Sequence, residues 1–202
     1  MDFVIGIIEF LAILTFAYTG LVEARKKDMD FVGACTLALV TAFGGGTVRD
    51  VLLNRRPLYW VEHYEYTIII FILSGVFLWL FRTNRGFFND KLIDTIDALG
   101  LGLFSASGVA IALENKIPVF PASLIGVITA VAGGVIRDVF CNEIPSIFQR
   151  VRLYVTCAFV GIWVYIALDY FGFSSLVCLI SCTLVVFFLR MAALKFDIRL
   201  PL

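Results

Sequence analysis

The chain has 202 residues and no net charge; 61% of its residues are hydrophobic and only 16% are charged. A water-soluble domain carries about a quarter of charged residues, so this composition excludes a soluble globular protein and a disordered chain. The zero net charge gives no general attraction to nucleic acid, which excludes a nucleic-acid binder. With a mean hydropathy of +0.97, the sequence predicts an integral membrane protein.

Seven stretches of the chain are apolar and close to the length of about 20 residues that a membrane-spanning helix needs. In chain order they cover 3–22, 31–53, 65–81, 92–113, 119–141, 153–171 and 174–194. The connectors between them are short and polar, so no soluble domain is left over. We therefore predict an all-α, polytopic membrane protein in which residues 1–202 form a single membrane domain with seven transmembrane helices.

Lysine and arginine are distributed unevenly between the two sides of this arrangement. The connectors after the first, third and fifth spans and the C-terminal tail hold the larger set: Arg25, Lys26, Lys27, Arg82, Arg85, Lys91, Arg150, Arg152, Arg190, Lys195 and Arg199. The other side holds Arg55, Arg56 and Lys116. Because positive residues stay in the cytoplasm, we expect the C-terminus inside the cell and the N-terminus outside.

The sequence contains an internal repeat. Residues 41–57 and 129–145 are identical at nine of 17 positions, and the offset of 88 extends without a gap back to Ile8 and Ile96. One repeat covers about 3–81, the other about 92–171, and the last helix, about 174–194, lies outside both. Since each repeat has three spans, the second copy enters the membrane from the opposite side. Such inverted repeats are typical of proteins that move solutes.

Glycine clusters lie near the middle of the second and fifth spans, at matching positions of the repeat. The first consists of Gly44, Gly45 and Gly46, and the second of Gly133 and Gly134. Consecutive glycines weaken a helix, and a helix that unwinds inside a membrane must line a cavity or be buried in protein. We expect both helices to be broken there, at the centre of the protein. The alternative is that the glycines let two helices pack closely.

Charged residues follow each glycine cluster at the same spacing: Arg49 and Asp50 in the first repeat, Arg137 and Asp138 in the second. Two further carboxylates, Glu9 and Asp97, occupy equivalent positions in the first and fourth spans. An unpaired charge is costly at this depth, so each group must face water or a partner. Glu9 and Asp97 therefore either line cavities or pair with the arginines. The arginine–aspartate pairs either border a pathway or only hold helices together.

The fourth span carries small residues at every fourth position: Ala98, Gly102, Ala106 and Ala110. This strip allows close helix contact, either within one subunit or between subunits.

The sequence offers little for catalysis. The five cysteines form no C-x-x-C pair, and His63 is the one histidine, so we expect no metal site, no cofactor and no enzyme. A channel or a carrier explains the features better. The two carboxylates at equivalent positions of the repeat, Glu9 and Asp97, make the interior more negative and favour a cation as the solute.

The segments 42–57 and 130–145, together with the seven spans and two repeats, resemble prokaryotic members of the trimeric intracellular cation (TRIC) channel family. The resemblance covers nearly the whole chain. It implies a homotrimer in the inner cell membrane of a prokaryote, in which each subunit has its own pore for monovalent cations, potassium and also sodium. Bacterial members also carry a glycine-transport label, so a facilitator or carrier of a small zwitterion such as glycine is the alternative.

Under this resemblance the two glycine clusters shape the pore. The residues that we expect along the ion pathway are Glu9, Gly44, Gly45, Gly46, Arg49, Asp50, Asp97, Gly133, Gly134, Arg137 and Asp138. The second cluster has Ala132 in place of its first glycine. Arg49 and Arg137 either line the pore or brace the helices beside it.

Overall fold

The computed structural model describes residues 2–81, 89–149 and 152–199, and almost all of them are helical. The long helices are α1 (Asp2–Lys26), α2 (Phe31–Leu52), α4 (Tyr64–Leu80), α5 (Asp90–Glu114), α6 (Val119–Phe140), α7 (Val155–Tyr170) and α8 (Ser175–Phe196). Two short elements complete the order, the single turn α3 (Tyr59–Glu62) and the 3₁₀ turn η1 (Ser146–Phe148). The prediction of an all-α protein is confirmed.

Five of these helices, α1, α2, α5, α6 and α8, are long and apolar enough to cross a membrane. Helices α4 and α7 are equally apolar but shorter, with 17 and 16 residues. Each predicted span coincides with one long helix, with ends that differ by a few residues. Three of the arginines on the predicted cytoplasmic side, Arg82, Arg85 and Arg150, lie outside the described residues.

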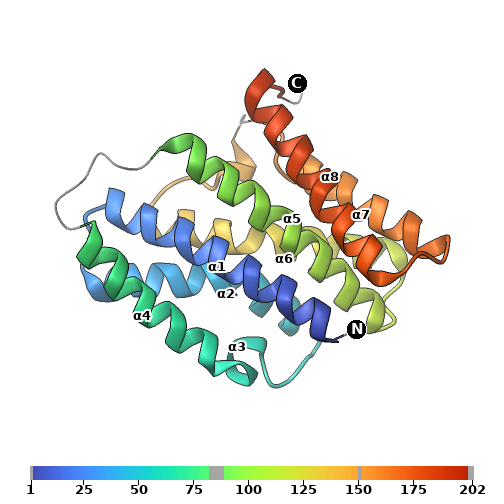
Figure 1. Cartoon of the computed structure of the whole chain (residues 1–202), viewed down its shortest axis with the longest axis horizontal. Coiled ribbons are helices and arrows are strands. Elements are labelled where there is room, and N and C mark those ends of the chain that lie inside the picture. The colour runs from blue at the N-terminus through green and yellow to red at the C-terminus, as the bar shows by residue number, and fades with distance from the viewer. Residues whose placement is uncertain (1, 82–88, 150–151, 200–202) are drawn as a thin grey trace.

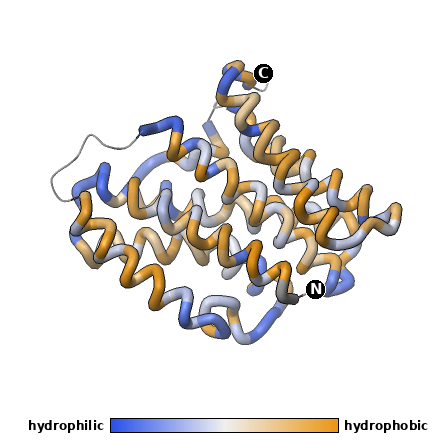
Figure 2. Tube along the Cα trace, in the orientation of Figure 1, coloured by the Kyte–Doolittle hydropathy of each residue, from blue (hydrophilic) through white to orange (hydrophobic). Residues whose placement is uncertain are grey.

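Helices α1, α2, α5 and α6 form the centre of the molecule (Figure 1). Helix α1 packs against α2 and α5, and α6 packs against the same two helices. Helix α4 lies beside α1 and α2, while α7 and α8 pack against α5 on the opposite flank. Helix α5 is therefore enclosed over much of its length, and residues 100–112 are all buried. Apolar residues run along all the long helices, with polar ones at their ends (Figure 2). That pattern fits a bilayer.

The two repeats end their helices in the same way. Asp28 and Lys116, which are 88 residues apart, both adopt a left-handed backbone with φ of 53° and 59°. Asn54 and Asn142, also 88 apart, do the same with φ of 52° and 55°. A left-handed residue is a common way to end a helix, because the following amide can then reach a carbonyl of the last turn. The repeat in the sequence is thus matched by equivalent turns in the structure.

The predicted breaks in the second and fifth spans are wrong: α2 continues through Gly44–Gly46, and α6 continues through Gly133–Gly134. The glycines instead remove side chains where the two helices cross. A Cβ on Gly45 would lie 2.0 Å from the carbonyl oxygen of Thr129, and one on Gly133 would lie 2.3 Å from that of Thr41. Close approach of two backbones, the alternative considered above, explains these two glycines.

The strip of small residues in the fourth span packs inside the subunit. A Cβ on Gly102 would lie 2.7 Å from the carbonyl oxygen of Thr183 on α8. Ala98, Ala106 and Ala110 are almost completely buried. The strip thus lets α8, the helix outside the repeat, lie close against α5.

Candidate functional site

The first charged cluster is fully buried at the centre of the molecule. Arg49 on α2 and Asp50 have no exposed surface, and Glu9 on α1 is 3% exposed. The Arg49 guanidinium donates a short hydrogen bond from Nη1 to Glu9 and another from Nε to Asp50 Oδ1 at 2.9 Å. Asp50 Oδ2 accepts the backbone N–H of Tyr59 at 2.9 Å. One positive and two negative groups thus form a closed network that joins α1, α2 and α3.

The second charged cluster has the same parts in a looser arrangement. Arg137 on α6 donates to Asp138 Oδ1 from Nε at 3.0 Å and from Nη2 at 2.8 Å. Asp138 Oδ2 accepts the backbone N–H of Ser146 at 3.0 Å. Asp97 Oδ1, however, lies 4.0 Å from Arg137 Nη1, and the side chains of Asp97 and Arg137 are 15% and 17% exposed. Asp97 is thus close to the arginine and still reaches open space.

The last glycine of each cluster lies beside the arginine that follows it. A Cβ on Gly46 would come 3.8 Å from Arg49 Nη2, and one on Gly134 would come 3.9 Å from Arg137 Nη2. Both are ordinary van der Waals distances. These two glycines therefore leave room next to a guanidinium, whereas Gly45 and Gly133 allow the helices to cross.

A cavity of about 660 Å³ opens beside α3. We call it the α3-side cavity; its charged and aromatic walls are Glu9, Phe10, Arg55, Tyr59, Glu62, His63, Tyr66 and Glu114. Helices α1, α3, α4 and α5 contribute to it. Three carboxylates and one arginine line this cavity. The Nη2 atom of Arg55 lies 3.9 Å from Oε2 of Glu62. The cavity is therefore polar, with more carboxylates than arginines in its walls.

A second cavity of about 180 Å³ lies beside η1. We call it the η1-side cavity; its charged and aromatic walls are Glu23, Asp94, Asp97, Arg137, Tyr154 and Arg190. Asp97 here and Glu9 in the α3-side cavity are equivalent residues of the repeat. The two cavities therefore occupy corresponding places in the two repeats, although the second is smaller.

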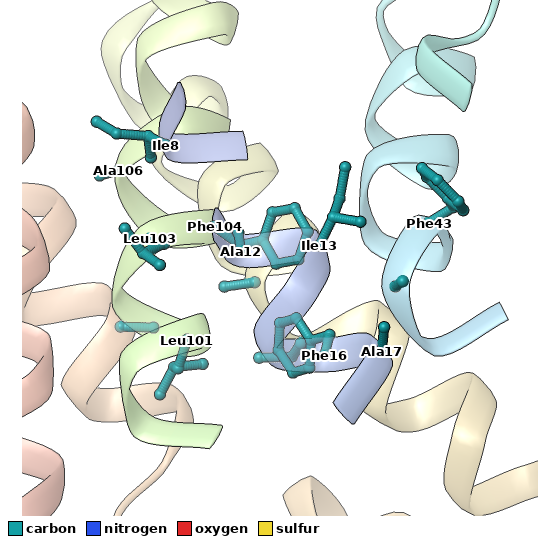
Figure 3. Close-up of a cluster of buried hydrophobic side chains, with 14 of the residues drawn as sticks. Ile8, Ala12, Ile13, Phe16, Ala17, Phe43, Leu101, Leu103, Phe104 and Ala106 are labelled. Carbon is teal, nitrogen blue, oxygen red and sulfur yellow. The ribbon is translucent and has the colours of Figure 1, made fainter. Parts of the chain in front are cut away.

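Along α1 and α5, buried apolar residues lie between the residues that line the α3-side cavity and those that line the η1-side cavity. Figure 3 shows several of these buried side chains. Ile13 and Phe16 on α1 and Leu101 and Phe104 on α5 belong to this layer, and all four are buried. The rings of Phe16 and Phe104, again equivalent residues, stack with centroids 5.1 Å apart. A small void of about 10 Å³, lined by Glu9, Gly46 and Phe104 among others, extends from the α3 side to this layer.

The predicted pathway residues thus fall into four groups. Glu9, Asp97, Arg137 and Gly134 line the two cavities, and Gly46 lines the small void. Arg49, Asp50 and Asp138 hold helices and connectors together, and Gly45 and Gly133 lie in the crossing of α2 and α6. Gly44 borders a third, apolar groove of about 370 Å³ between α2, α4 and α6.

Several lining residues were not predicted. Tyr59, Glu62 and Glu114 border the α3-side cavity, and Tyr154 and Arg190 border the η1-side cavity. Arg190 could have been found, because it is a charged residue inside a predicted span and such residues are usually functional. Tyr59 and Tyr154 lie in or next to connectors, where the repeat gives no signal.

Comparison with known proteins places this geometry in a family. The family model described as "Glycine transporter" matches residues 6–83 and 94–170. The chain is 34% identical to the UPF0126 inner membrane protein YadS of Escherichia coli K12, over 96% of this chain and 93% of that protein. It is 32% identical to a UPF0126 membrane protein of Vibrio cholerae, over 96% of this chain and 81% of that protein.

Two solved structures have the same fold. One is the TRIC trimeric intracellular cation channel orthologue from Rhodobacter sphaeroides, with a TM-score of 0.87, 32% identity and coverage of 96% of this chain and 99% of that chain. The other was described in work on conductance through TRIC cation channels, with a TM-score of 0.86, 34% identity and coverage of 98% and 96%. The chain therefore belongs to the TRIC family of membrane channels, as its sequence motifs predicted.

Proposed function

We propose that the protein is a potassium-permeable channel for monovalent cations, with a pathway in each subunit of a homotrimer. The observation that carries this proposal is the pair of charged cavities toward opposite ends of α1 and α5, with buried apolar residues of both helices between them. The names of the structural relatives, TRIC cation channels, support the same function. In the described conformation Phe16 and Phe104 close the route, because a hydrated ion does not cross a layer of packed apolar side chains.

The charge of the cavities supports a cation as the permeating species. Three carboxylates outweigh one arginine around the α3-side cavity, and three outweigh two around the η1-side cavity. A cleft with excess negative charge raises the local concentration of cations. The carboxylates that line the two cavities, with the partly exposed Asp97 among them, carry this preference.

We further propose the membrane arrangement that the sequence predicted: seven crossings, inverted repeats at about 3–81 and 92–171, and an extra helix at about 174–194. Two observations support it. The family model matches the chain in two segments, 6–83 and 94–170, and equivalent residues form equivalent contacts in both halves. The excess of lysine and arginine at the ends of α1, α6 and α8 supports an η1 side that faces the cytoplasm.

A facilitator for a small zwitterion such as glycine is the second candidate. The description of the matching family favours it, and so does the η1-side cavity, where the carboxylate of Asp97 lies beside Arg137. A carboxylate and a guanidinium side by side match the ammonium and carboxylate ends of a free amino acid.

Purified protein in a planar bilayer under a potassium chloride gradient tests the proposal. Unitary current steps that reverse near the potassium equilibrium potential are expected. Replacing Phe104 by Ala should raise the open probability, since it removes half of the stacked pair. Absence of steps in both proteins, together with saturable glycine uptake into liposomes, would overturn the channel in favour of the carrier.

A further inference from the structure

The η1-side cavity contains a positive charge that does not come from the repeat. Arg190 lies on α8, is 9% exposed and lines this cavity together with Asp94, Asp97 and Arg137. Glu9, Arg49 and Asp50 of the first repeat correspond to Asp97, Arg137 and Asp138 of the second. Helix α8 lies outside both repeats and has no equivalent helix. The cavity on the α3 side therefore has no residue that corresponds to Arg190.

The position of the Arg190 guanidinium is fixed by several contacts. Its Nη1 donates to the carbonyl oxygens of Arg152 at 3.1 Å and Leu153 at 2.8 Å. Its Cζ lies 4.8 Å from the centre of the Tyr154 ring, a cation–π contact. These partners are two neutral carbonyls and a ring, so they hold the group without cancelling its charge. Its Nε is buried without a hydrogen-bond partner among the described residues.

We propose that Arg190 makes the ion pathway electrically asymmetric: its fixed charge lowers the concentration of cations in the η1-side cavity and thereby limits the current that enters from that side. This inference rests on the proposed cation channel. Arg190 does not bind the ion; it acts on the cavity in which the carboxylate of Asp97 collects cations. A unit charge acting through water over about 7 Å changes the local concentration of a monovalent ion about threefold.

Replacing Arg190 by Gln tests the proposal. Channels expressed in bacterial spheroplasts have one orientation, so inside-out patches separate currents that enter from each side. At about 0.05 M potassium chloride we expect R190Q to raise the potassium current entering from the η1 side about two- to threefold, with a smaller change for the opposite direction. At about 1 M salt, where the screening length is near 3 Å, the difference in current between R190Q and the wild type should almost vanish.

Two variants serve as controls. R190K keeps the positive charge and should retain the wild-type ratio of the two currents. Lys195→Gln removes a charge from an exposed residue near the end of the same helix, outside the residues that line the cavity, and should leave the ratio unchanged. Both variants and R190Q should elute as the wild-type oligomer.

The possible results separate this inference from the channel itself. Absence of wild-type current contradicts the proposed function. If the wild type conducts and R190Q has the same ratio of inward to outward current as K195Q at low salt, the role of Arg190 is overturned. The proposed channel function is not affected by that result. A change in R190K as large as in R190Q also overturns it, because the shape of the guanidinium would then matter and not its charge.

If R190Q does not fold, R190C provides a second route. A cationic thiol reagent should lower the current entering from the η1 side relative to a neutral reagent of similar size, and wild-type protein treated in the same way provides the baseline. Equal currents with the two adducts would overturn the proposal.

Discussion

The two charged clusters have the same sequence pattern and different surroundings. In both, an arginine binds the aspartate that follows it, and that aspartate accepts an N–H from the next connector. Glu9, however, is only 3% exposed and accepts a hydrogen bond from Arg49, while Asp97 lies 4.0 Å from Arg137 and its side chain is 15% exposed. The repeat determines the local hydrogen bonds. The elements beside each cluster differ: the α3 turn with Tyr59 lies on one side, and η1 with Arg190 of α8 on the other.

The strongest test of this difference is to remove each arginine. Arg49→Gln leaves two buried carboxylates without their positive partner, and breaking a buried ion pair in this way costs about 3–5 kcal/mol. We expect R49Q to lose most of its folded protein. Arg137→Gln leaves groups that reach the η1-side cavity and can be hydrated, so we expect a folded protein with altered current. Thermal unfolding and the yield of the oligomer measure the contrast; equal losses in both variants would show that the two clusters are energetically alike.

Alanine substitutions separate the glycines at the helix crossing from those beside the arginines. G45A and G133A place a methyl group within 2.0 and 2.3 Å of a backbone oxygen, and backbone cannot move aside as a side chain does. Overpacking of this kind typically costs about 1–3 kcal/mol or more. G46A and G134A are the matched controls, with ordinary contacts at 3.8 and 3.9 Å, and alanine favours the helix. A midpoint of unfolding that falls equally in all four variants would contradict the crossing described here.

The carboxylates Asp97 and Glu9 should have different effects, with Asp97 acting on the ion current and Glu9 on the stability of the fold. Asp97→Asn removes a charge from the η1-side cavity, so we expect a folded channel whose potassium current from that side falls about two- to threefold at low salt. Glu9→Gln leaves Arg49 with one carboxylate, so its main effect should be lower stability. Single-channel currents and unfolding midpoints of both variants measure this. A stable E9Q with reduced current would show that Glu9 acts as Asp97 does.

The smallest effect is expected at the exposed ends of the helices. Lys27 forms a short hydrogen bond with Glu143, which raises the pKa of the lysine above its ordinary value of 10.5. The contact therefore contributes fully at neutral pH, and the lysine's part in it is lost as the pH rises through that raised pKa. Because exposed pairs contribute little, Lys27→Met should shift the unfolding midpoint by less than about 2 °C. A larger shift at pH 7 would mean that this connector supports the second cluster.

Hydropathy and the repeat predicted most of the fold. Every predicted span coincides with a long helix because apolar runs of this length have one stable form in a bilayer. The pairing of Glu9 with Arg49 was one of two stated options, and the repeat then placed Asp97 near Arg137. The glycine break was wrong because the cost of glycine in a helix is small beside the gain from the close contact between α2 and α6. Tyr59, Tyr154 and Arg190 come from α3, a connector and α8, to which a three-span repeat assigns no role.

The reciprocal contact between α2 and α6 has a mechanical consequence. Gly45 meets the backbone of Thr129, and Gly133 meets that of Thr41, so the two helices touch main chain to main chain around one point. Neither glycine has a side chain that could compress or change rotamer at these two contacts. A change in the angle between the two helices would therefore pivot about this contact and leave it in place. The displacement would grow toward the helix ends, where Asp50 and Asp138 hold the segments that border the two cavities.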